Sequence, residues 1–253
     1  MNKLAVAAVY LVLALSGSVF ASPLLVVVNS SLTQVPNAGP WPVIPLHASF
    51  TAGPNGAETI GTDETPPIFP FNIPSGTEGY AGMYLELLDN SPGAPATESV
   101  TFTMLGHGDS TFNNEFRLFA NQSDLATRSN PFFTWTQGGT AIGTTATVNL
   151  PVNTLLPFLF TANLTGPSVG NNGSDNQVPC DGANCSPAFG VFDVSQTALN
   201  QGRTFWLGFS DGGAPTDYDQ QDLVIRASVP EPGSLLLLTT ASLLLGALRR
   251  RER

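Results

Sequence analysis

The middle of the chain alternates between short apolar runs and polar turns. In the segment Val100-Thr101-Phe102-Thr103-Met104, apolar residues occupy every second position, which is the period of a strand with one buried face. The run at 204–209 is more continuously apolar, as in a strand covered on both faces. No stretch of residues 22–229 has a convincing helical period. The pattern therefore predicts strands at 24–28, 80–88, 100–105, 115–120, 132–136, 144–150, 156–162, 188–192, 204–210 and 223–227.

This succession of short strands indicates an all-β protein. Gly, Pro, Asn and Asp separate the runs, as in the turns of sandwiches and barrels. No internal repeat is present, so a solenoid or a propeller is not expected. We predict a single β-sandwich, jelly-roll-like domain over residues 22–228, between two terminal segments of a different kind.

The N-terminal segment has the layout of a cleavable signal peptide. Lys3 precedes an apolar run at 4–20, and Val19-Phe20-Ala21 fits the small-x-small pattern of a cleavage site. We predict that residues 1–21 are removed by signal peptidase between Ala21 and Ser22. The alternative is a retained membrane anchor, for which the apolar run is short.

The C-terminal segment has a different layout. An apolar run at 235–248 follows Pro230-Glu231-Pro232, and the arginines Arg249, Arg250 and Arg251 follow that run. As a helix it would be roughly 20 Å long against a hydrocarbon core of about 30 Å, which makes a marginal transmembrane helix. Cationic flanks stay in the cytoplasm, so the body before Pro230 is expected on the opposite side of the membrane.

The order Pro-Glu-Pro, apolar helix and arginine cluster, over residues 229–253, resembles the PEP-CTERM sorting signal. The resemblance implies an exosortase-type membrane protease as a partner, which removes the tail near residues 230–232. It also implies a Gram-negative host that makes exopolysaccharide. The protein would be exported across the inner membrane to the cell surface or the extracellular space. It would contact the membrane only through the C-terminal helix, before processing.

The charge balance narrows the choice of partners. Residues 22–229 contain four arginines, no lysine and 17 acidic residues, and the whole chain has a net charge of −10. Nucleic acids and anionic membrane surfaces need a cationic footprint, so we exclude both as partners of the body. An acidic body suits an extracellular protein that meets divalent cations.

The two cysteines, Cys180 and Cys185, are separated by four residues. In an oxidising compartment we expect them to form a local disulfide. A metal-binding pair is the alternative, but it would need further ligands, and the chain has only two histidines, His47 and His107.

The densest acidic cluster comprises Asp211, Asp217, Asp219 and Asp222 and lies between the last two predicted strands. Calcium takes oxygen ligands from Asp-rich turns of this kind, so the cluster is a candidate calcium site and calcium the one candidate cofactor. It is not an EF-hand, since Thr216 stands where that loop needs glycine. The alternative is a solvated turn whose aspartates cap backbone N–H groups.

The same region resembles the end of the β-domain in many PEP-CTERM proteins. A Trp-Leu-Gly strand, an Asp-Gly turn, an Asp-rich segment and an Asp-hydrophobic-Val strand follow one another at 206–209, 211–212, 217–219 and 222–226. Gln220 and Gln221 depart from that pattern, because relatives often have acidic residues or histidine there. This departure weakens the argument for a metal.

No catalytic motif emerges from the sequence. His107, Asp109 and Ser110 are close together, but adjacency does not make a triad, and the surrounding glycines favour a turn. We predict a non-enzymatic exported surface or matrix protein linked to exopolysaccharide or biofilm. One alternative is a jelly-roll carbohydrate-binding module, which an exposed line of Trp or Tyr would favour, although Trp135 and Trp206 are expected in the core. The other is an extracellular polysaccharide-acting enzyme, which would need two carboxylates in a cleft.

Overall fold

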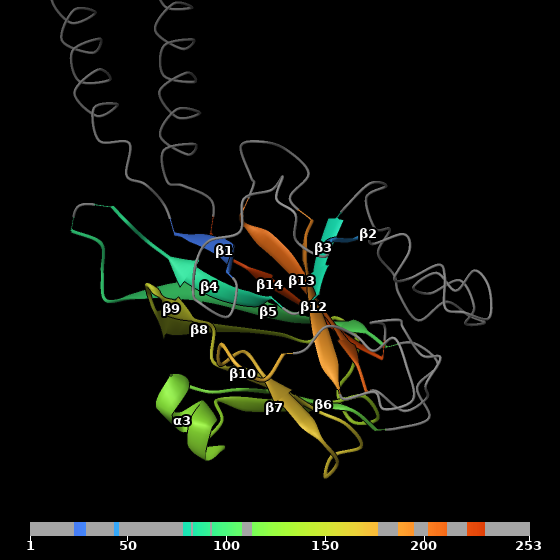
Figure 1. The fold of residues 1–253 in the computed structure, drawn as a ribbon. Coiled ribbons are helices and arrows are strands. Elements are labelled where there is room, and N and C mark those ends of the chain that lie inside the picture. The colour runs from blue at the N-terminus through green and yellow to red at the C-terminus, as the bar shows by residue number, and fades with distance from the viewer. Residues whose placement is uncertain are drawn as a thin grey trace, which may run out of the picture.

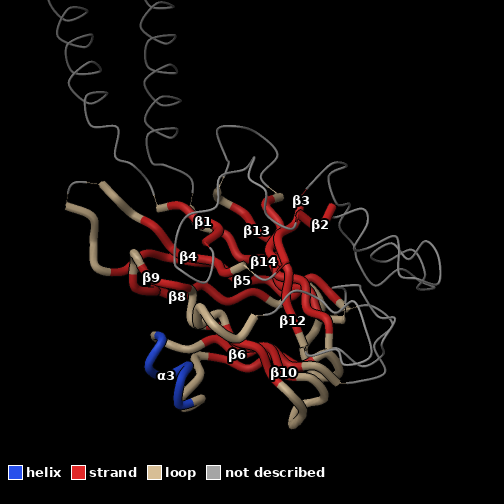
Figure 2. The backbone as a smooth tube through the Cα atoms, viewed as in Figure 1, coloured by secondary structure: helices blue, strands red, loops and turns tan. Residues whose placement is uncertain are grey.

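The computed structural model describes residues 23–28, 43–45, 78–81, 83–91, 93–107, 113–176, 187–194, 202–211 and 222–230. These residues form three antiparallel sheets and one short helix, so the prediction of an all-β protein is confirmed (Figures 1 and 2). The predicted signal peptide and the predicted C-terminal helix lie outside this part of the chain. Within it, no helix is long and apolar enough to cross a membrane.

The largest sheet has seven strands in the order β2-β3-β12-β13-β14-β5-β8. Its last two strands in the sequence, β13 and β14, are neighbours at its centre, with Phe209 opposite Leu223. A register shift between Val224 and Ile225 interrupts the pairing of β14 with β5. The strands are β2 (Val43–Pro45), β3 (Glu78–Ala81), β5 (Thr97–Gly106), β8 (Thr145–Pro151), β12 (Ala188–Asp193), β13 (Thr204–Ser210) and β14 (Leu223–Ser228).

Two smaller sheets complete the fold. The three-stranded sheet has the order β1-β4-β9, with β1 (Leu24–Val28), β4 (Tyr84–Leu88) and β9 (Thr154–Leu155). The four-stranded sheet has the order β11-β10-β6-β7, with β6 (Glu115–Leu118), β7 (Phe133–Thr136), β10 (Phe158–Thr161) and β11 (Ser168–Gly170).

The helix α3 (Gln122–Thr127) connects β6 to β7. Its N-cap is Asn121, whose side chain accepts a hydrogen bond from the backbone N–H of Asp124. The helix ends at Arg128, which has a left-handed backbone with φ of 54°. Capping at both ends explains how six residues sustain a helical turn without a helical hydrophobic period.

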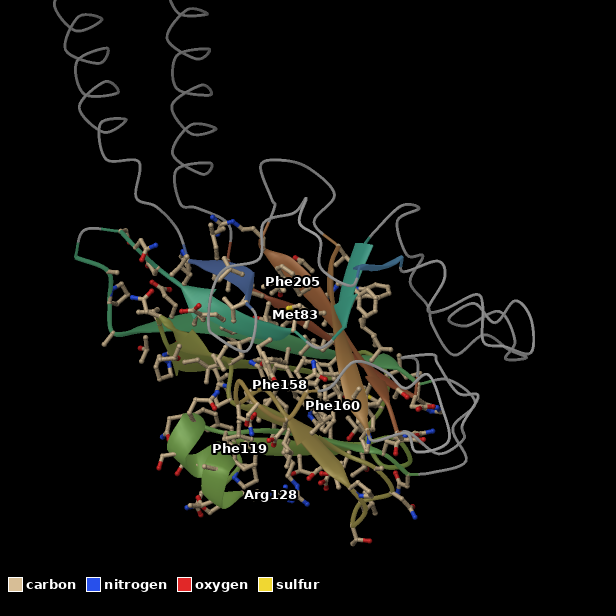
Figure 3. The ribbon with its side chains drawn as sticks, viewed as in Figure 1. Met83, Phe119, Arg128, Phe158, Phe160 and Phe205 are labelled. Carbon is tan, nitrogen blue, oxygen red and sulfur yellow. The ribbon has the colours of Figure 1, made fainter. Side chains whose placement is uncertain are left out.

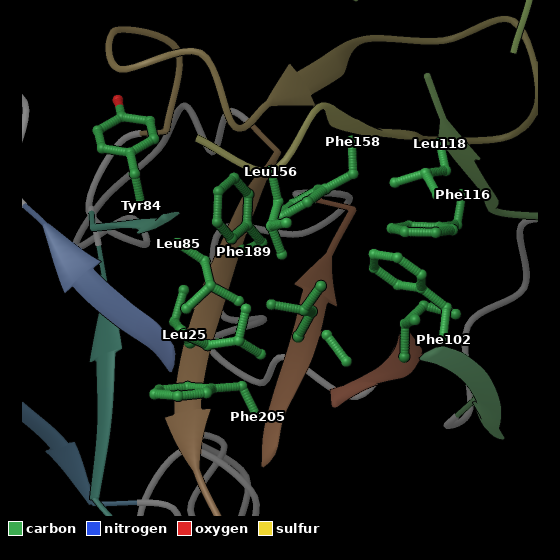
Figure 4. Close-up of a cluster of buried hydrophobic side chains, with 14 of the residues drawn as sticks. Leu25, Tyr84, Leu85, Phe102, Phe116, Leu118, Leu156, Phe158, Phe189 and Phe205 are labelled. Atoms are coloured by element: carbon green, nitrogen blue, oxygen red, sulfur yellow. The ribbon is translucent and has the colours of Figure 1, made fainter. Parts of the chain in front are cut away.

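Aromatic side chains join the sheets into one core. Phe102 of β5 lies 5.9 Å from Phe116 of β6, measured between ring centroids, and both are fully buried (Figure 4). Phe160 of β10 stacks on Phe209 of β13 at 4.9 Å with an interplanar angle of 4°. Figure 3 shows Phe158 and Phe160 pointing into the layer between the four-stranded sheet and the large sheet. Apolar residues at alternate strand positions thus supply the burial that the sequence pattern predicted.

One predicted strand is wrong in an instructive way. The apolar run at 80–88 is not a single strand, because β3 and β4 belong to different sheets. Val191 of β12 pairs with Tyr80, whereas Val28 of β1 pairs with Tyr84. Apolar residues continue across the point where the chain changes sheets, so hydrophobicity alone does not reveal the change.

Candidate functional site

The acidic hairpin that connects β13 to β14 begins at Asp211 and ends at Asp222. A carboxylate oxygen of Asp222 accepts a hydrogen bond from the backbone N–H of Asp211, at 2.7 Å. Asp211 is 7% exposed and Asp222 is 1% exposed. The antiparallel pairing of the two strands places these residues together, because each lies just beyond the register pair Phe209–Leu223. Two of the four predicted aspartates therefore meet at the base of the hairpin.

Asn114 connects this hairpin to the four-stranded sheet. Its side-chain amide donates a hydrogen bond to Oδ2 of Asp211 at 3.0 Å, and its Oδ1 accepts one from the backbone N–H of Asn163 at 3.1 Å. Asn114 is fully buried and immediately precedes β6. The carboxylate of Asp211 is thus held by a side chain that is in turn fixed by the turn after β10.

A second layer of polar contacts lies behind Asn114. Gln137 forms two hydrogen bonds with the backbone of Asn114. The backbone N–H of Gln137 donates to the Asn114 carbonyl at 2.9 Å, and the backbone N–H of Asn114 donates to Oε1 of Gln137 at 3.3 Å. Gln137 Nε2 lies 3.1 Å from Nδ1 of His107. His107, which the sequence placed in a glycine-rich turn, therefore takes part in a structural network.

These contacts show what the carboxylates do within the described part of the chain. The carboxylate of Asp222 accepts a hydrogen bond from a backbone N–H, which is the behaviour expected of a capping aspartate, whereas that of Asp211 accepts one from the side-chain amide of Asn114. Asp217 and Asp219 lie outside the described residues. Among the residues that are described, no group of three or more His, Cys, Asp or Glu side chains is arranged to hold a metal ion.

The start and the end of the folded body meet at a single arginine. Nη1 of Arg203 donates a hydrogen bond to the carbonyl oxygen of Pro230 at 2.6 Å and another to the carbonyl oxygen of Pro23 at 3.1 Å. Arg203 lies just before β13 and is 7% exposed. Pro230 is the first proline of the Pro-Glu-Pro sequence, and Pro23 is the second residue after the predicted signal-peptide cleavage site.

Comparison with known proteins identifies this end of the chain. Residues 228–251 match the family described as the PEP-CTERM protein-sorting motif. The chain carries a PEP-CTERM sorting motif. The motif marks an exported protein that is processed by exosortase, a membrane protein, after transient anchoring through its C-terminal tail. No curated protein and no solved structure matches the chain.

The PEP-CTERM motif begins inside the folded body. Its first matched residue, Ser228, is the last residue of β14, where it lies opposite Thr204 of β13. The next residue, Val229, is 6% exposed. The sorting motif therefore begins at the last residue of β14, an inner strand of the large sheet, with no linker between them.

The remaining predicted site residues lie outside the described part of the chain. They are the cysteines Cys180 and Cys185, the cleavage-site residues Ala21 and Ser22, and the tail residues Glu231, Pro232, Arg249, Arg250 and Arg251. The disulfide and the signal-peptide cleavage stay predictions.

The aromatic residues bear on the carbohydrate-binding alternative. Trp135 and Trp206 are each 5% exposed, as expected for core residues. Phe132, at 50% exposure, is the aromatic side chain most open to solvent in the described part of the chain. Tyr84 is 1% exposed, so all the Trp and Tyr side chains whose exposure the structure describes are buried.

Sequence reasoning missed Asn114 and Arg203, and no local pattern distinguishes either residue. Asn114 contacts Asp211 across 97 positions of the chain, and Arg203 contacts Pro23 across 180. One indication was available for Arg203, which is among only four basic residues in the body. A buried arginine is uncommon unless its donors are satisfied.

Proposed function

We propose that this protein is an exosortase-sorted surface or extracellular matrix protein whose body is non-enzymatic and associates with exopolysaccharide in a biofilm. The observation that carries the proposal is the PEP-CTERM motif at residues 228–251, joined directly to the last strand of the body. The acidic composition of the body supports an extracellular role.

We further propose that the three sheets form a jelly-roll-like sandwich. The aromatic contacts between Phe102 and Phe116, and between Phe160 and Phe209, support this arrangement because each joins the seven-stranded to the four-stranded sheet. Calcium remains the candidate ligand of the acidic hairpin. The hydrogen bond between Asp211 and Asp222 supports this, because it brings together the first and last aspartates of the segment that also contains Asp217 and Asp219.

The sorting part is tested by the mass of the mature protein. In a Gram-negative host with an exosortase, the exported protein should lack residues 235–253, and deletion of the exosortase gene should leave the tail attached. Replacing both Pro230 and Pro232 with alanine should also block removal. An intact tail on the wild-type protein in exosortase-positive cells would refute the sorting role.

The matrix role is tested separately with the purified body. Residues 22–230 should co-sediment with exopolysaccharide from the same host and should show no release of reducing or unsaturated sugar ends from it. A body that remains in the supernatant at every concentration of polysaccharide would contradict the association. Release of sugar ends would instead support the alternative of a polysaccharide-acting enzyme.

A further inference from the structure

The cationic side chain of Arg203 engages the sorting motif and the start of the body together. Both carbonyl oxygens, of Pro23 and of Pro230, contact the same nitrogen, Nη1. Pro23 and Pro230 therefore lie side by side, because both carbonyl oxygens accept hydrogen bonds from that nitrogen. Hydrogen bonds from a charged donor are stronger than those between neutral groups, and this donor is buried.

Backbone contacts reinforce this junction on both sides. The carbonyl of Arg203 accepts a hydrogen bond from Val229 N–H at 2.9 Å, and the carbonyl of Gly202 accepts one from Leu25 N–H at 2.6 Å. Gly202 has a φ of +75°, and a Cβ atom there would lie 3.0 Å from the carbonyl oxygen of Leu25. The turn before β13 therefore needs glycine, and it presents Arg203 to both ends in one fixed place.

The carbonyl held at Pro230 belongs to the peptide bond between Pro230 and Glu231. A protease stabilises the oxyanion that forms on a scissile carbonyl with its own hydrogen-bond donors, so that oxygen must reach the enzyme. In the folded body this oxygen instead faces Arg203, and the preceding residue, Val229, is buried with its N–H bonded. The carbonyl oxygen of Pro230 is thus already bonded to Arg203 while the junction is intact, although Pro230 as a residue is exposed.

We propose that Arg203 is a positioning residue for exosortase processing, which holds Pro230 beside Pro23 and shields the Pro230–Glu231 bond, so that the tail is cut at a later bond. The inference rests on the proposed sorting role. In hydrolysis, the C–N bond breaks, water adds its hydroxyl group to the carbonyl carbon, and a proton from that water goes to the amine of the released tail. The body keeps the new carboxylate, and Pro230 stays bound beside Pro23.

The test compares the C-terminal residue of the mature protein between variants of the full chain. Intact-mass measurement should give wild-type protein that ends at Glu231 or beyond. Arg203→Gln removes the charged donor, and the mature protein should then include species that end at Pro230. Arg203→Lys keeps one cationic nitrogen with enough hydrogens for both carbonyls, so it should restore the wild-type end.

Two further variants separate positioning from general destabilisation. Arg117→Gln removes a cation that pairs with Glu115 in the four-stranded sheet, and it should leave the position of the cut unchanged. Insertion of Gly-Ser-Gly between Val229 and Pro230 preserves Arg203 and the Pro-Glu-Pro sequence but moves Pro230 away from the arginine. This insertion should produce the same new end as Arg203→Gln, even if the arginine variant itself fails to fold.

The outcomes distinguish the two proposals. A wild-type protein that keeps its tail would overturn the sorting role and this inference together. A wild-type protein that is cut, with the same end in the Arg203→Gln and insertion variants, would overturn the positioning role alone. Wild-type protein that already ends at Pro230 would also overturn it.

Discussion

Asp222 closes the acidic hairpin by accepting a hydrogen bond from the backbone N–H of Asp211, at 2.7 Å. The contact joins the last residue before β14 to the first residue after β13, and both are buried. A buried N–H that loses its acceptor carries a desolvation penalty, so this pair contributes to the stability of the body whether or not the hairpin binds a ligand.

Asp222→Ala should lower the free energy of unfolding of residues 22–230 by about 1–3 kcal/mol, because the N–H of Asp211 would be buried without an acceptor. Asp222→Asn keeps a side-chain oxygen and should be less destabilising. Urea denaturation of both variants measures the difference. Equal stability of the alanine variant and the wild type would contradict the capping role.

Calcium binding by Asp211, Asp217, Asp219 and Asp222 would appear as a stabilisation of the folded body. A ligand at about a hundredfold excess over its dissociation constant stabilises the state it binds by about 2.7 kcal/mol. For a domain of this size, that gain raises the melting temperature by several degrees. Differential scanning calorimetry with about 10 mM calcium, and again with chelator, measures it at the weak affinity typical of extracellular modules.

The matched control for calcium replaces Asp219 and Asp222 with asparagine, which should abolish the calcium response. Asp124→Asn, at the remote helix α3, should retain it. Identical melting curves of the wild type with calcium and with chelator would leave these aspartates with the capping role alone.

Asn171 connects β4 to Leu156, the residue that follows β9. Its side chain accepts a hydrogen bond from Leu85 N–H at 2.9 Å and donates to the carbonyls of Leu85 and Leu156 at 2.7 and 2.8 Å. Asn171→Ala should lower the free energy of unfolding by about 1–3 kcal/mol, because the buried N–H of Leu85 loses its acceptor. The carbonyls of Leu85 and Leu156 still accept hydrogen bonds from Leu156 N–H and Phe158 N–H. Asn149→Ala, on the exposed face of β8, should change it by less than about 0.5 kcal/mol. Similar losses in both variants would show that the buried network adds nothing beyond an exposed contact.

The disulfide prediction concerns a bond that closes a short loop. Non-reducing peptide mapping of the exported protein should find Cys180 linked to Cys185. The expected stabilisation is about 2 kcal/mol in the chain-entropy model, so reduction should lower the melting temperature without unfolding the body. Free thiols at both positions would refute the prediction.

The sequence located the strands best where an apolar run was bounded by polar turns. The predicted strands at 204–210 and 223–227 coincide with β13 and β14 to within a residue, because their inward side chains are apolar and their ends are marked by polar turns. Helix α3 was not predicted, since six residues are too few to show a period. The cap formed by Asn121 and Asp124 was the available indication.

The candidate site was only partly predictable for a related reason. Asp211 and Asp222 lie close together because they flank the connection between two consecutive antiparallel strands, β13 and β14. A hairpin of this kind is a local feature that can be predicted from the sequence. The contacts of Asn114 with Asp211, and of Arg203 with Pro23 and Pro230, depend on how the sheets pack. A single asparagine or arginine carries no pattern that specifies a partner so far along the chain.

Glu86 provides a test of stability against pH. It lies on β4 between Val26 of β1 and Leu155 of β9, and partial burial among these strands raises its pKa above the usual 4.5. The folded state therefore binds this proton more tightly than the unfolded state. The resulting stabilisation is fully present below the ordinary pKa and is lost as the pH rises through the raised one.

Glu86→Gln, which is neutral throughout, should melt slightly higher than the wild type near neutral pH, and the two should converge as the pH falls below about 4. The gain should be small because the carboxyl group is partly solvated. Thermal melts from about pH 4 to about pH 8 measure the difference, with Glu98→Gln on β5 as a control for the loss of one charge. A difference that stays constant across this range, or that grows on acidification, would exclude burial of Glu86 as its cause.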